Sequence, residues 1–394
     1  MTPAARVQSA IEILDSVIAA ANGQGAPADR LLSEWFRTHR FAGSSDKRAI
    51  REHVYSAIRA CGPVPKSGRK AMLRVAKNDA DLSALFDGSS AHAPAPIEPG
   101  ETPAEGGLAP QWLEERLAQS GVSGADALAL LERAPLDLRV NTLKTTRNLV
   151  DLPVQIEPLA APDAIRVPAG SPVEQWPAFF AGEIEVQDLG SQLACRAVDA
   201  RSGETVIDLC AGAGGKTLAL AAAMGGEGTL IAADTDRGRL SRLPPRVGRA
   251  GARMIESVLL NPGRELESLG TLVGKADRVL IDAPCSGTGT WRRNPEARWR
   301  LSPHELTRLT ELQARLLGIA AQLLRPGGTI TYITCSLLDE EGAGQVDAFL
   351  AAHAGWRAET PKLPLGDPRG PGIRLSPARH ATDGFFIACI VSPC

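Results

Sequence analysis

Apolar residues recur at helical spacing through the first part of the chain. In residues 6–20 they are separated by four, three and four positions, which is the pattern of one face of an α-helix. These apolar positions are Val7, Ile11, Leu14 and Ile18. Residues 46–61 repeat the pattern, and Pro and Gly separate the segments. Residues 1–88 are therefore predicted to form a small, all-helical domain.

The stretch from 89 to 110 breaks this pattern. It is rich in Pro, Ala, Gly and Glu and offers few side chains to a core, so a linker or exposed loop is expected. Beyond it, the sequence PQWLEERLAQSG predicts a helix that ends at Gly121. Alternating positions in LDLRVNTLK (136–144) predict a strand.

A regular alternation of apolar strands and amphipathic helices follows, from about residue 204 to 391. The strands are nearly continuous apolar runs, which are typical of strands buried on both faces. Strands of this kind separated by helices predict an α/β domain whose mostly parallel sheet carries helices on both faces.

The net charge of −2 hides an uneven distribution. Residues 1–79 hold 13 Lys or Arg against 7 Asp or Glu. A basic helical domain is compatible with a polyanionic partner, although a solvated helical face would show the same excess.

Several classes of protein do not fit the sequence. The apolar runs are too short for a membrane span, and residues 1–20 contain charges in place of a signal-peptide core. Seven cysteines without CxxC spacing and six dispersed histidines predict neither a disulfide framework nor a metal site. A soluble, cytoplasmic protein with reduced thiols is expected.

A glycine-rich turn, DLCAGAGGKT (208–217), joins a predicted strand to a predicted helix. Asp234 ends the next strand, where a carboxylate could bind a ribose hydroxyl pair. A P-loop would need glycine where Cys210 stands, and a dinucleotide motif would need glycine where Thr217 stands. The turn fits an S-adenosylmethionine (SAM) site best, and tight helix–sheet packing remains the alternative.

Three further side chains fall at the ends of predicted parallel strands. Asp282 and Cys285 follow one strand, and Cys335 follows another. Since ligands of open α/β sheets bind at the carboxyl ends of the strands, these residues and the glycine turn are expected to meet at one edge.

These segments resemble a known family. IDAPCSGTGTWRRNPEARW and YITCSLLDEE resemble the two signature motifs of the RsmB/Sun family of RNA (cytosine-5) methyltransferases, and FAGSSDKRAI, LRVNTLK, DLCAGAGGKT and TDGFFIA agree with it. The resemblance extends from about residue 30 to 391. It implies a Rossmann-like class I methyltransferase domain preceded by a NusB-like helical, RNA-binding domain. Within the former, residues 111–200 would be an N-terminal subdomain and 201–394 the SAM-binding catalytic domain.

The resemblance also implies roles for individual residues. Cys335 would be the nucleophile that attacks carbon 6 of a cytosine, Cys285 would help to resolve the covalent product, and Asp282 would hydrogen-bond the base. The implied SAM-binding residues are Cys210, Ala211, Gly212, Ala213, Gly214, Gly215, Lys216, Asp234, Asn261 and Asp282. The sequence departs from the family at Gly212 and Ala213, where Ala and Pro are usual, and after the third strand, where Asn261 or Pro262 replaces an acid.

RNA contacts are expected in two places. The segment 290–300 holds four arginines and two tryptophans, which suit phosphate binding and base stacking. A loop pinned by tryptophan packing and an Arg–Glu pair is the structural alternative. The expected RNA-binding residues are Arg292, Arg293 and Arg298 in this segment and Arg37, Arg40, Lys47 and Arg48 in the helical domain.

The leading hypothesis is a monomeric enzyme that transfers methyl from SAM to carbon 5 of a cytosine in ribosomal RNA. The same chemistry on transfer RNA, or a non-catalytic RNA-binding or assembly factor, remains open.

Overall fold

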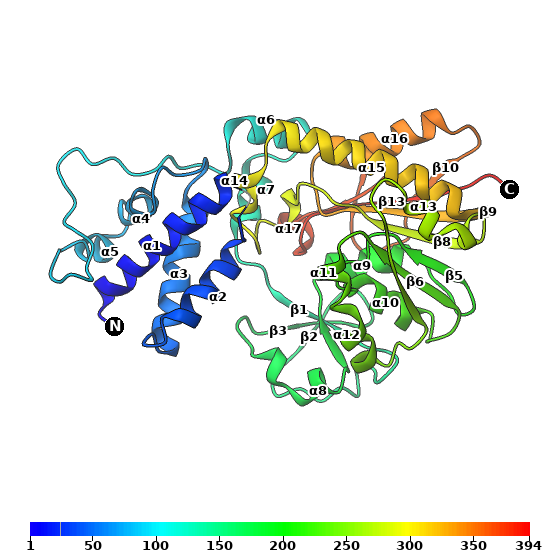
Figure 1. Ribbon diagram of the computed structural model, residues 1–394, viewed down its shortest axis with the longest axis horizontal. Helices are drawn as coiled ribbons and strands as arrows, with labels where there is room; N and C mark the ends of the chain where they lie inside the picture. Colours follow the sequence, from blue (N-terminus) through cyan, green and yellow to red (C-terminus); the bar gives the residue numbers. More distant parts are fainter. Residues whose placement is uncertain (24) are drawn as a thin grey trace. The chain divides into compact units, whose positions relative to one another are not determined.

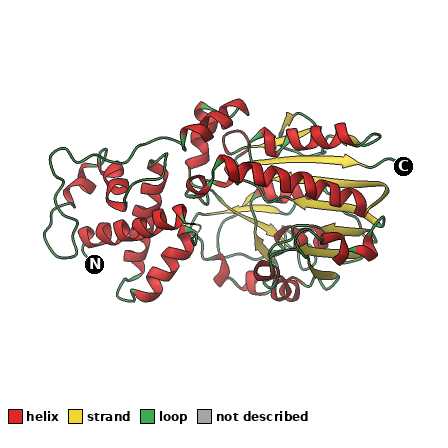
Figure 2. Cartoon of the chain, turned by 45° about the horizontal axis from the view of Figure 1, so that its top comes forward, coloured by secondary structure: helices red, strands yellow, loops and turns green. Residues whose placement is uncertain are grey.

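Two compact units make up the chain (Figure 1). The computed structural model describes residues 1–23 and 25–394. We call Met1–Glu132 together with Thr290–Ser302 the helical unit, and Arg133–Gly289 together with Pro303–Cys394 the α/β unit. All strands found in the described residues belong to the α/β unit (yellow in Figure 2).

The helical unit is built from amphipathic helices. Its elements are α1 (Pro3–Asn22), α2 (Ala28–Thr38), α3 (Ser44–Ala60), α4 (Gly68–Ala76), α5 (Ala80–Ala84), α6 (Gln111–Gln119), α7 (Gly124–Leu128), η1 (Ala129–Leu131) and α14 (Ala297–Arg300). In α1 the apolar residues predicted at helical spacing, Val7, Ile11, Leu14 and Ile18, are all buried. The Thr2 side chain accepts a hydrogen bond from the Ala5 N–H at 3.2 Å and so caps the first turn.

Residues distant in sequence complete the core of the helical unit. Trp299 packs into the cluster formed by buried side chains of α1 to α4, as does Ala104. Residues 89–110 form no regular helix or strand beyond the isolated bridge between Cys61 and Gly106. The stretch nevertheless contacts α4, because the Ala104 N–H donates to the Lys70 carbonyl at 2.9 Å.

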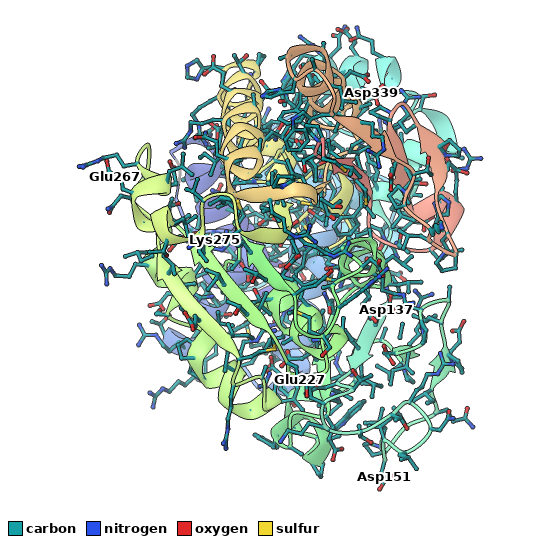
Figure 3. All side chains as sticks on the ribbon, turned by 90° about the vertical axis from the view of Figure 1, so that its right-hand side faces the viewer. Asp137, Asp151, Glu227, Glu267, Lys275 and Asp339 are labelled. Atoms are coloured by element: carbon teal, nitrogen blue, oxygen red, sulfur yellow. The ribbon has the colours of Figure 1, made fainter. Side chains whose placement is uncertain are left out.

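A small antiparallel sheet opens the α/β unit. Its strands are β1 (Leu136–Val140), β2 (Glu157–Pro158), β3 (Ala164–Val167) and β4 (Ile184–Val186), in the order β2-β3-β1-β4. Asp137 of β1, labelled in Figure 3, pairs with Arg166 of β3 at 2.7 Å. The neighbouring helical elements are η2 (Val173–Gln175), α8 (Pro177–Phe180) and α9 (Leu189–Ala197).

A nine-stranded sheet forms the centre of the α/β unit, with β11-β12-β13-β9-β8-β5-β6-β7 in order and β10 paired to β13. The strands are β5 (Thr205–Asp208), β6 (Thr229–Asp234), β7 (Ile255–Leu259), β8 (Ala276–Asp282), β9 (Leu324–Thr334), β10 (Arg357–Glu359), β11 (Asp367–Arg369), β12 (Gly372–Leu375) and β13 (Phe385–Val391). The helical elements are α10 (Gly215–Ala223), α11 (Arg237–Leu240), α12 (Leu243–Ala250), α13 (Glu265–Ser268), η3 (Gly270–Leu272), η4 (Thr288–Thr290), α15 (Pro303–Leu323), η5 (Asp339–Glu341), α16 (Ala343–Ala352) and α17 (Pro377–His380).

The pairing of the strands changes from parallel to antiparallel across the sheet. Strands β9, β8, β5, β6 and β7 pair in parallel, whereas β13 runs antiparallel to β9 and extends the sheet through β12 and β11. The carboxyl ends of β5, β6, β8 and β9 therefore lie along one edge, which is where a ligand site is expected.

Helices cover both faces of this sheet (Figure 1). On one face Ile207, Ile281 and Tyr332 pack with α15 and α16, and on the other Val206 and Leu280 pack with α9 and α10. Adjacent residues of one strand thus enter opposite cores, which explains why these strands are apolar without interruption. The predicted fold class, an α/β domain preceded by a helical one, is confirmed.

The limits of the two units differ from those of the predicted domains. Residues 89–132 belong to the helical unit, and so does the segment 290–302, which follows β8 in the chain. The predicted boundaries at residues 88, 110 and 200 remain predictions about functional domains.

Candidate active site

The glycine-rich turn lies between β5 and α10, as predicted. Gly212 and Gly214 have φ of 55° and 84°, the left-handed region in which side chains other than glycine are strained. A β-carbon on Gly212 would also lie 2.3 Å from the Arg239 guanidinium. The turn as it stands uses the conformational freedom of glycine, and a larger residue at 212 would also require the Arg239 side chain to move.

Asp234, at the end of β6, holds this turn in place. One carboxylate oxygen accepts a hydrogen bond from the Gly212 N–H, and the other accepts from the Asp236 N–H, both at 2.7 Å. A carboxylate oxygen can accept more than one hydrogen bond. Asp234 can therefore position the turn and still bind a hydroxyl group.

A buried lysine faces the carboxylate at the end of β8. Lys216, in the first turn of α10, donates from Nζ to Asp282 Oδ2 at 2.6 Å. Burial disfavours the charge on Lys216, but the Asp282 carboxylate outweighs burial, and the pKa of Lys216 is raised above its usual value. Both groups are thereby held as an ion pair beside the thiols.

The two predicted catalytic cysteines are neighbours in space. Sγ of Cys285 lies 3.4 Å from Sγ of Cys335, although fifty positions separate them in the chain. The hydrogen bond to Cys335 and burial raise the pKa of the Cys285 thiol well above its ordinary value. The two sulfurs are close enough for the Cys285 thiol to donate a hydrogen bond to Cys335.

A buried carboxylate ties together the loops that carry these cysteines. Glu341 is fully buried and accepts hydrogen bonds from the Ser286 N–H at 2.8 Å, from the Ser286 hydroxyl and from Gln313 Nε2 at 3.1 Å. The Thr288 and Ser336 hydroxyls, 3.1 Å apart, join the same two loops. Glu341 lies in η5, at the opposite end of that short helix from Asp339 (labelled in Figure 3). These hydrogen bonds thus hold the loop after β8 and the loop after β9 in position relative to each other.

A cavity of about 470 Å³ opens beside these groups. Of the predicted site residues, Cys210, Asp234, Asp282, Cys285 and Cys335 line it. Ala211, Gly212, Ala213, Gly214 and Gly215 form the adjoining turn without lining the cavity, and Lys216 reaches the site through Asp282. The wall after β7 is made by Leu260 and Pro262 rather than by Asn261.

Sequence reasoning missed part of this cavity. Arg308, Leu312 and Arg315 of α15 line it, and Arg315 donates to the buried Glu265 at 2.7 Å. Their spacing of four and three positions places them on one face of a helix. That spacing is visible in the sequence, but the sequence does not show that this face borders the site.

The predicted RNA-binding residues lie in different surroundings. Arg37, Arg40 and Arg48 are exposed, and Lys47 is half-buried. In the 290–302 segment Arg292 is largely buried and Arg293 half-buried.

Arg298 is fully buried within the helical unit. It donates to the carbonyls of Ile58 at 2.7 Å and Cys61 at 2.8 Å, at the carboxyl end of α3, and also to that of Pro295. Trp299 donates from Nε1 to the Gly62 carbonyl at 3.1 Å. This is the structural alternative of a pinned loop, so Arg298 is not retained among the residues proposed to contact RNA.

The residues present fit a nucleoside cofactor with a cationic sulfur. The cavity is within the size range of small-molecule sites, and it brings Asp234, Asp236 and Asp282 together with apolar walls from Leu209, Leu260 and Leu312. Among residues 1–23 and 25–394, we find no cluster of three His, Cys, Asp or Glu side chains that could hold a metal ion. No helix in the same residues is long and apolar enough to cross a membrane.

Comparisons with known proteins agree with this geometry. Residues 195–391 match the family model of the 16S rRNA methyltransferase RsmB/F. A probable ribosomal RNA small subunit methyltransferase B of Synechocystis sp. is 35% identical over 297 residues, which are 71% of this chain and 66% of that protein. The chain thus spans 66% of the length of the curated relatives it matches.

Solved structures extend the similarity to the whole chain. The crystal structure of PH0851 matches with a TM-score of 0.78 and 26% identity over 99% of each chain. A methyltransferase homolog protein from Pyrococcus horikoshii matches with a TM-score of 0.59 and 27% identity over 72% of this chain and 99% of that one. The chain belongs to the RsmB/F family of 16S rRNA methyltransferases.

Proposed function

We propose that this chain transfers a methyl group from SAM to carbon 5 of a cytosine in ribosomal RNA, through a covalent bond between Cys335 and carbon 6. The observation that carries the proposal is the pair of thiols 3.4 Å apart on the wall of the cavity that Asp234 and Asp282 also line. The curated relatives are named ribosomal RNA small subunit methyltransferases, which supports ribosomal RNA as the substrate.

The turn at 210–215, Lys216, Asp234 and Asp282 would hold the cofactor. When bound, SAM supplies an electrophilic methyl group on a sulfonium. Asp234 would accept hydrogen bonds from the ribose hydroxyls. Asn261, which does not line the cavity, is left out of the proposed contacts, and the wall at Pro262 takes its place.

Cys335 would act as the nucleophile. Carbon 5 of cytosine is weakly nucleophilic, and addition of a thiolate to carbon 6 makes it reactive. A bond forms between Sγ of Cys335 and carbon 6 as the π bond between carbons 5 and 6 breaks, and its electron pair becomes available at carbon 5, delocalised toward nitrogen 3. A thiolate is needed for this step, and the protonated Cys285 thiol at 3.4 Å can stabilise it by donating a hydrogen bond.

Asp282 would orient the base. Its carboxylate, held by Lys216 at 2.6 Å, can accept hydrogen bonds from the exocyclic amine and from nitrogen 3 once that atom is protonated. Release of the product requires that carbon 5 lose its proton to solvent, that the electron pair of this C–H bond re-form the 5,6 double bond, and that the bond between Sγ of Cys335 and carbon 6 break, with its electron pair leaving on the sulfur. We assign Cys285 to this release, since its sulfur is close enough to that of Cys335 to exchange a proton with the departing thiolate. The target cytosine must leave its stack to reach the thiols.

The proposal is tested by transfer of labelled methyl from SAM to ribosomal RNA from a strain lacking this protein, with wild type and Cys335→Ala compared. Label at carbon 5 of cytosine that disappears in the variant is expected. Full transfer by Cys335→Ala would overturn the proposed nucleophile. Transfer to transfer RNA alone would replace the substrate, and no transfer to any RNA would favour a binding factor. The cytoplasm remains the expected compartment, and a monomer the expected state.

A further inference from the structure

A second large cavity lies in the helical unit, and the proposed chemistry does not use it. Its volume is about 590 Å³, and its walls come from α1, the end of α2, the loop before α3 and residues near 90. A cavity of this size is within the range of ligand sites. It belongs wholly to the helical unit and contains none of the residues assigned to catalysis.

Aromatic rings form one wall of the cavity. Trp35 and His39 are stacked, with ring centroids 4.0 Å apart and planes 3° apart. The Phe41 ring lies 6.4 Å from Trp35 and 5.7 Å from His39, nearly perpendicular to both. Phe41 is 68% exposed and lines the cavity, so its ring is accessible to a ligand that enters.

Hydrogen-bonding groups of α1 line the same cavity. Gln8 and Glu12, one turn apart on α1, both line the cavity, and Gln8 Nε2 donates to Glu12 Oε1 at 3.0 Å. The second carboxylate oxygen of Glu12 is an acceptor without a hydrogen-bond donor among the described residues. Such a wall suits a flat ligand that carries N–H donors on its rim.

Positive charge flanks the aromatic wall. Between residues 35 and 51 there are five Lys or Arg and a single acid, Asp46. Asp46 is paired with Arg6 at 2.8 Å. Arg40 and Arg48 form no hydrogen bond or ion pair with any residue that the structure describes. A ligand with a phosphate backbone complements this surface, because exposed Lys and Arg attract phosphates without regard to sequence.

We propose that this cavity binds one unstacked base of the RNA substrate, a base that bears an exocyclic amino group. The aromatic wall would stack on the base, the Glu12 carboxylate would accept from its amino group, and the basic side chains would contact the flanking phosphates. Uracil fits less well, because its carbonyl oxygens face the carboxylate. The inference rests on the proposed function, since it takes the substrate to be RNA.

The test measures binding of two fluorescein-labelled 12-nucleotide RNAs, oligocytidylate and oligouridylate, to the full chain by fluorescence anisotropy at fixed salt. Stacking on one aromatic side chain contributes about 1–3 kcal/mol, so Phe41→Ala is expected to weaken oligocytidylate binding about 5- to 150-fold. Phe180→Ala is the matched control, because Phe180 is 69% exposed and lies in the α/β unit. The control is expected to bind as wild type does.

Two further variants separate base stacking from a merely apolar contact. Phe41→Trp should retain the affinity, whereas Phe41→Leu should lose it. Glu12→Gln should reduce the preference for oligocytidylate over oligouridylate. Unchanged binding by Phe41→Ala, or equal binding by the Leu and Trp variants, would overturn the inference.

Methyl transfer to ribosomal RNA by the wild type is measured in parallel. If the wild type transfers methyl while Phe41→Ala binds RNA normally, only the inference about the cavity fails. If the wild type transfers no methyl to any RNA, the proposed function fails, whatever the anisotropy shows.

Discussion

Replacing Glu341 tests whether the two cysteine loops depend on one buried carboxylate. Glu341 accepts hydrogen bonds from two groups of Ser286 and from Gln313. In Glu341→Ala the Ser286 N–H and one N–H of the Gln313 amide lose their acceptor, whereas the other N–H of that amide keeps the Pro284 carbonyl at 2.9 Å. Each orphaned donor costs about 1–3 kcal/mol, so we expect the free energy of unfolding to fall by about 2–6 kcal/mol.

Glu341→Gln should cost less. Glutamine retains one acceptor oxygen, and the Ser286 hydroxyl can turn to accept from the new amide, so a loss of about 1–2 kcal/mol is expected. Asp347→Asn is the control, because it removes the same charge from an exposed position on α16. It should change stability by less than about 0.5 kcal/mol.

Urea unfolding followed by circular dichroism measures these differences, and single-turnover methyl transfer measures the effect on the site. Since the Glu341 network sets the position of Cys285 relative to Cys335, transfer should fall in the order wild type, Gln, Ala. A displacement of about 1 Å at reacting groups can cost about a hundredfold in rate. An alanine variant as stable and as active as the wild type would refute the view that Glu341 fixes these loops.

Three other changes have expected outcomes. Lys216→Met removes the cation that holds the Asp282 carboxylate at 2.6 Å, so methyl transfer should fall by at least about tenfold because the base is no longer oriented, and single-turnover methyl transfer would measure the loss. Burial raises the pKa of Asp208 in the folded chain to about 7, above its value in the unfolded chain. The protonated carboxyl therefore contributes stability at low pH, and this contribution is lost as the pH rises toward 7. Asp208→Asn should therefore weaken the loss of stability between about pH 4 and about pH 7 in urea unfolding, and an unchanged loss would contradict the assignment. Arg298→Met removes the donor to the Cys61 carbonyl and one of the two donors to the Ile58 carbonyl. It should lower the melting temperature of the helical unit, while RNA binding below that temperature stays normal; a selective loss of RNA affinity would instead restore Arg298 as an RNA contact.

The parallel strands and the turn could be predicted because their signals are local. Apolar runs such as that of β8, left-handed glycines such as Gly214 and an acid at the end of β6 are each visible within a few residues. The rule that parallel strands end at one edge then brings Asp282 and Cys335 together without further information.

The remaining features depend on contacts distant in sequence. The place of 290–302 in the helical unit is fixed by Arg298 bonding to carbonyls about 240 positions away, and neither partner has a pattern that names the other. The four arginines of this segment predicted RNA binding. In the structure one of them, Arg298, is buried and donates to carbonyls at the end of α3. The role of Glu341 could not be predicted from the sequence either. An acid in the sequence DEE resembles a surface residue until its three hydrogen-bond donors are known.

Trapping of a covalent protein–RNA complex tests the central claim most directly. Wild type, Cys285→Ala and Cys335→Ala would be incubated with SAM and substrate ribosomal RNA and separated under denaturing conditions. If Cys335 forms the bond to carbon 6 and Cys285 assists its release, the Cys285 variant should accumulate a denaturation-resistant complex that the Cys335 variant cannot form. A complex that persists in Cys335→Ala, or that appears in neither variant while methyl transfer continues, would contradict the assigned roles of the two thiols.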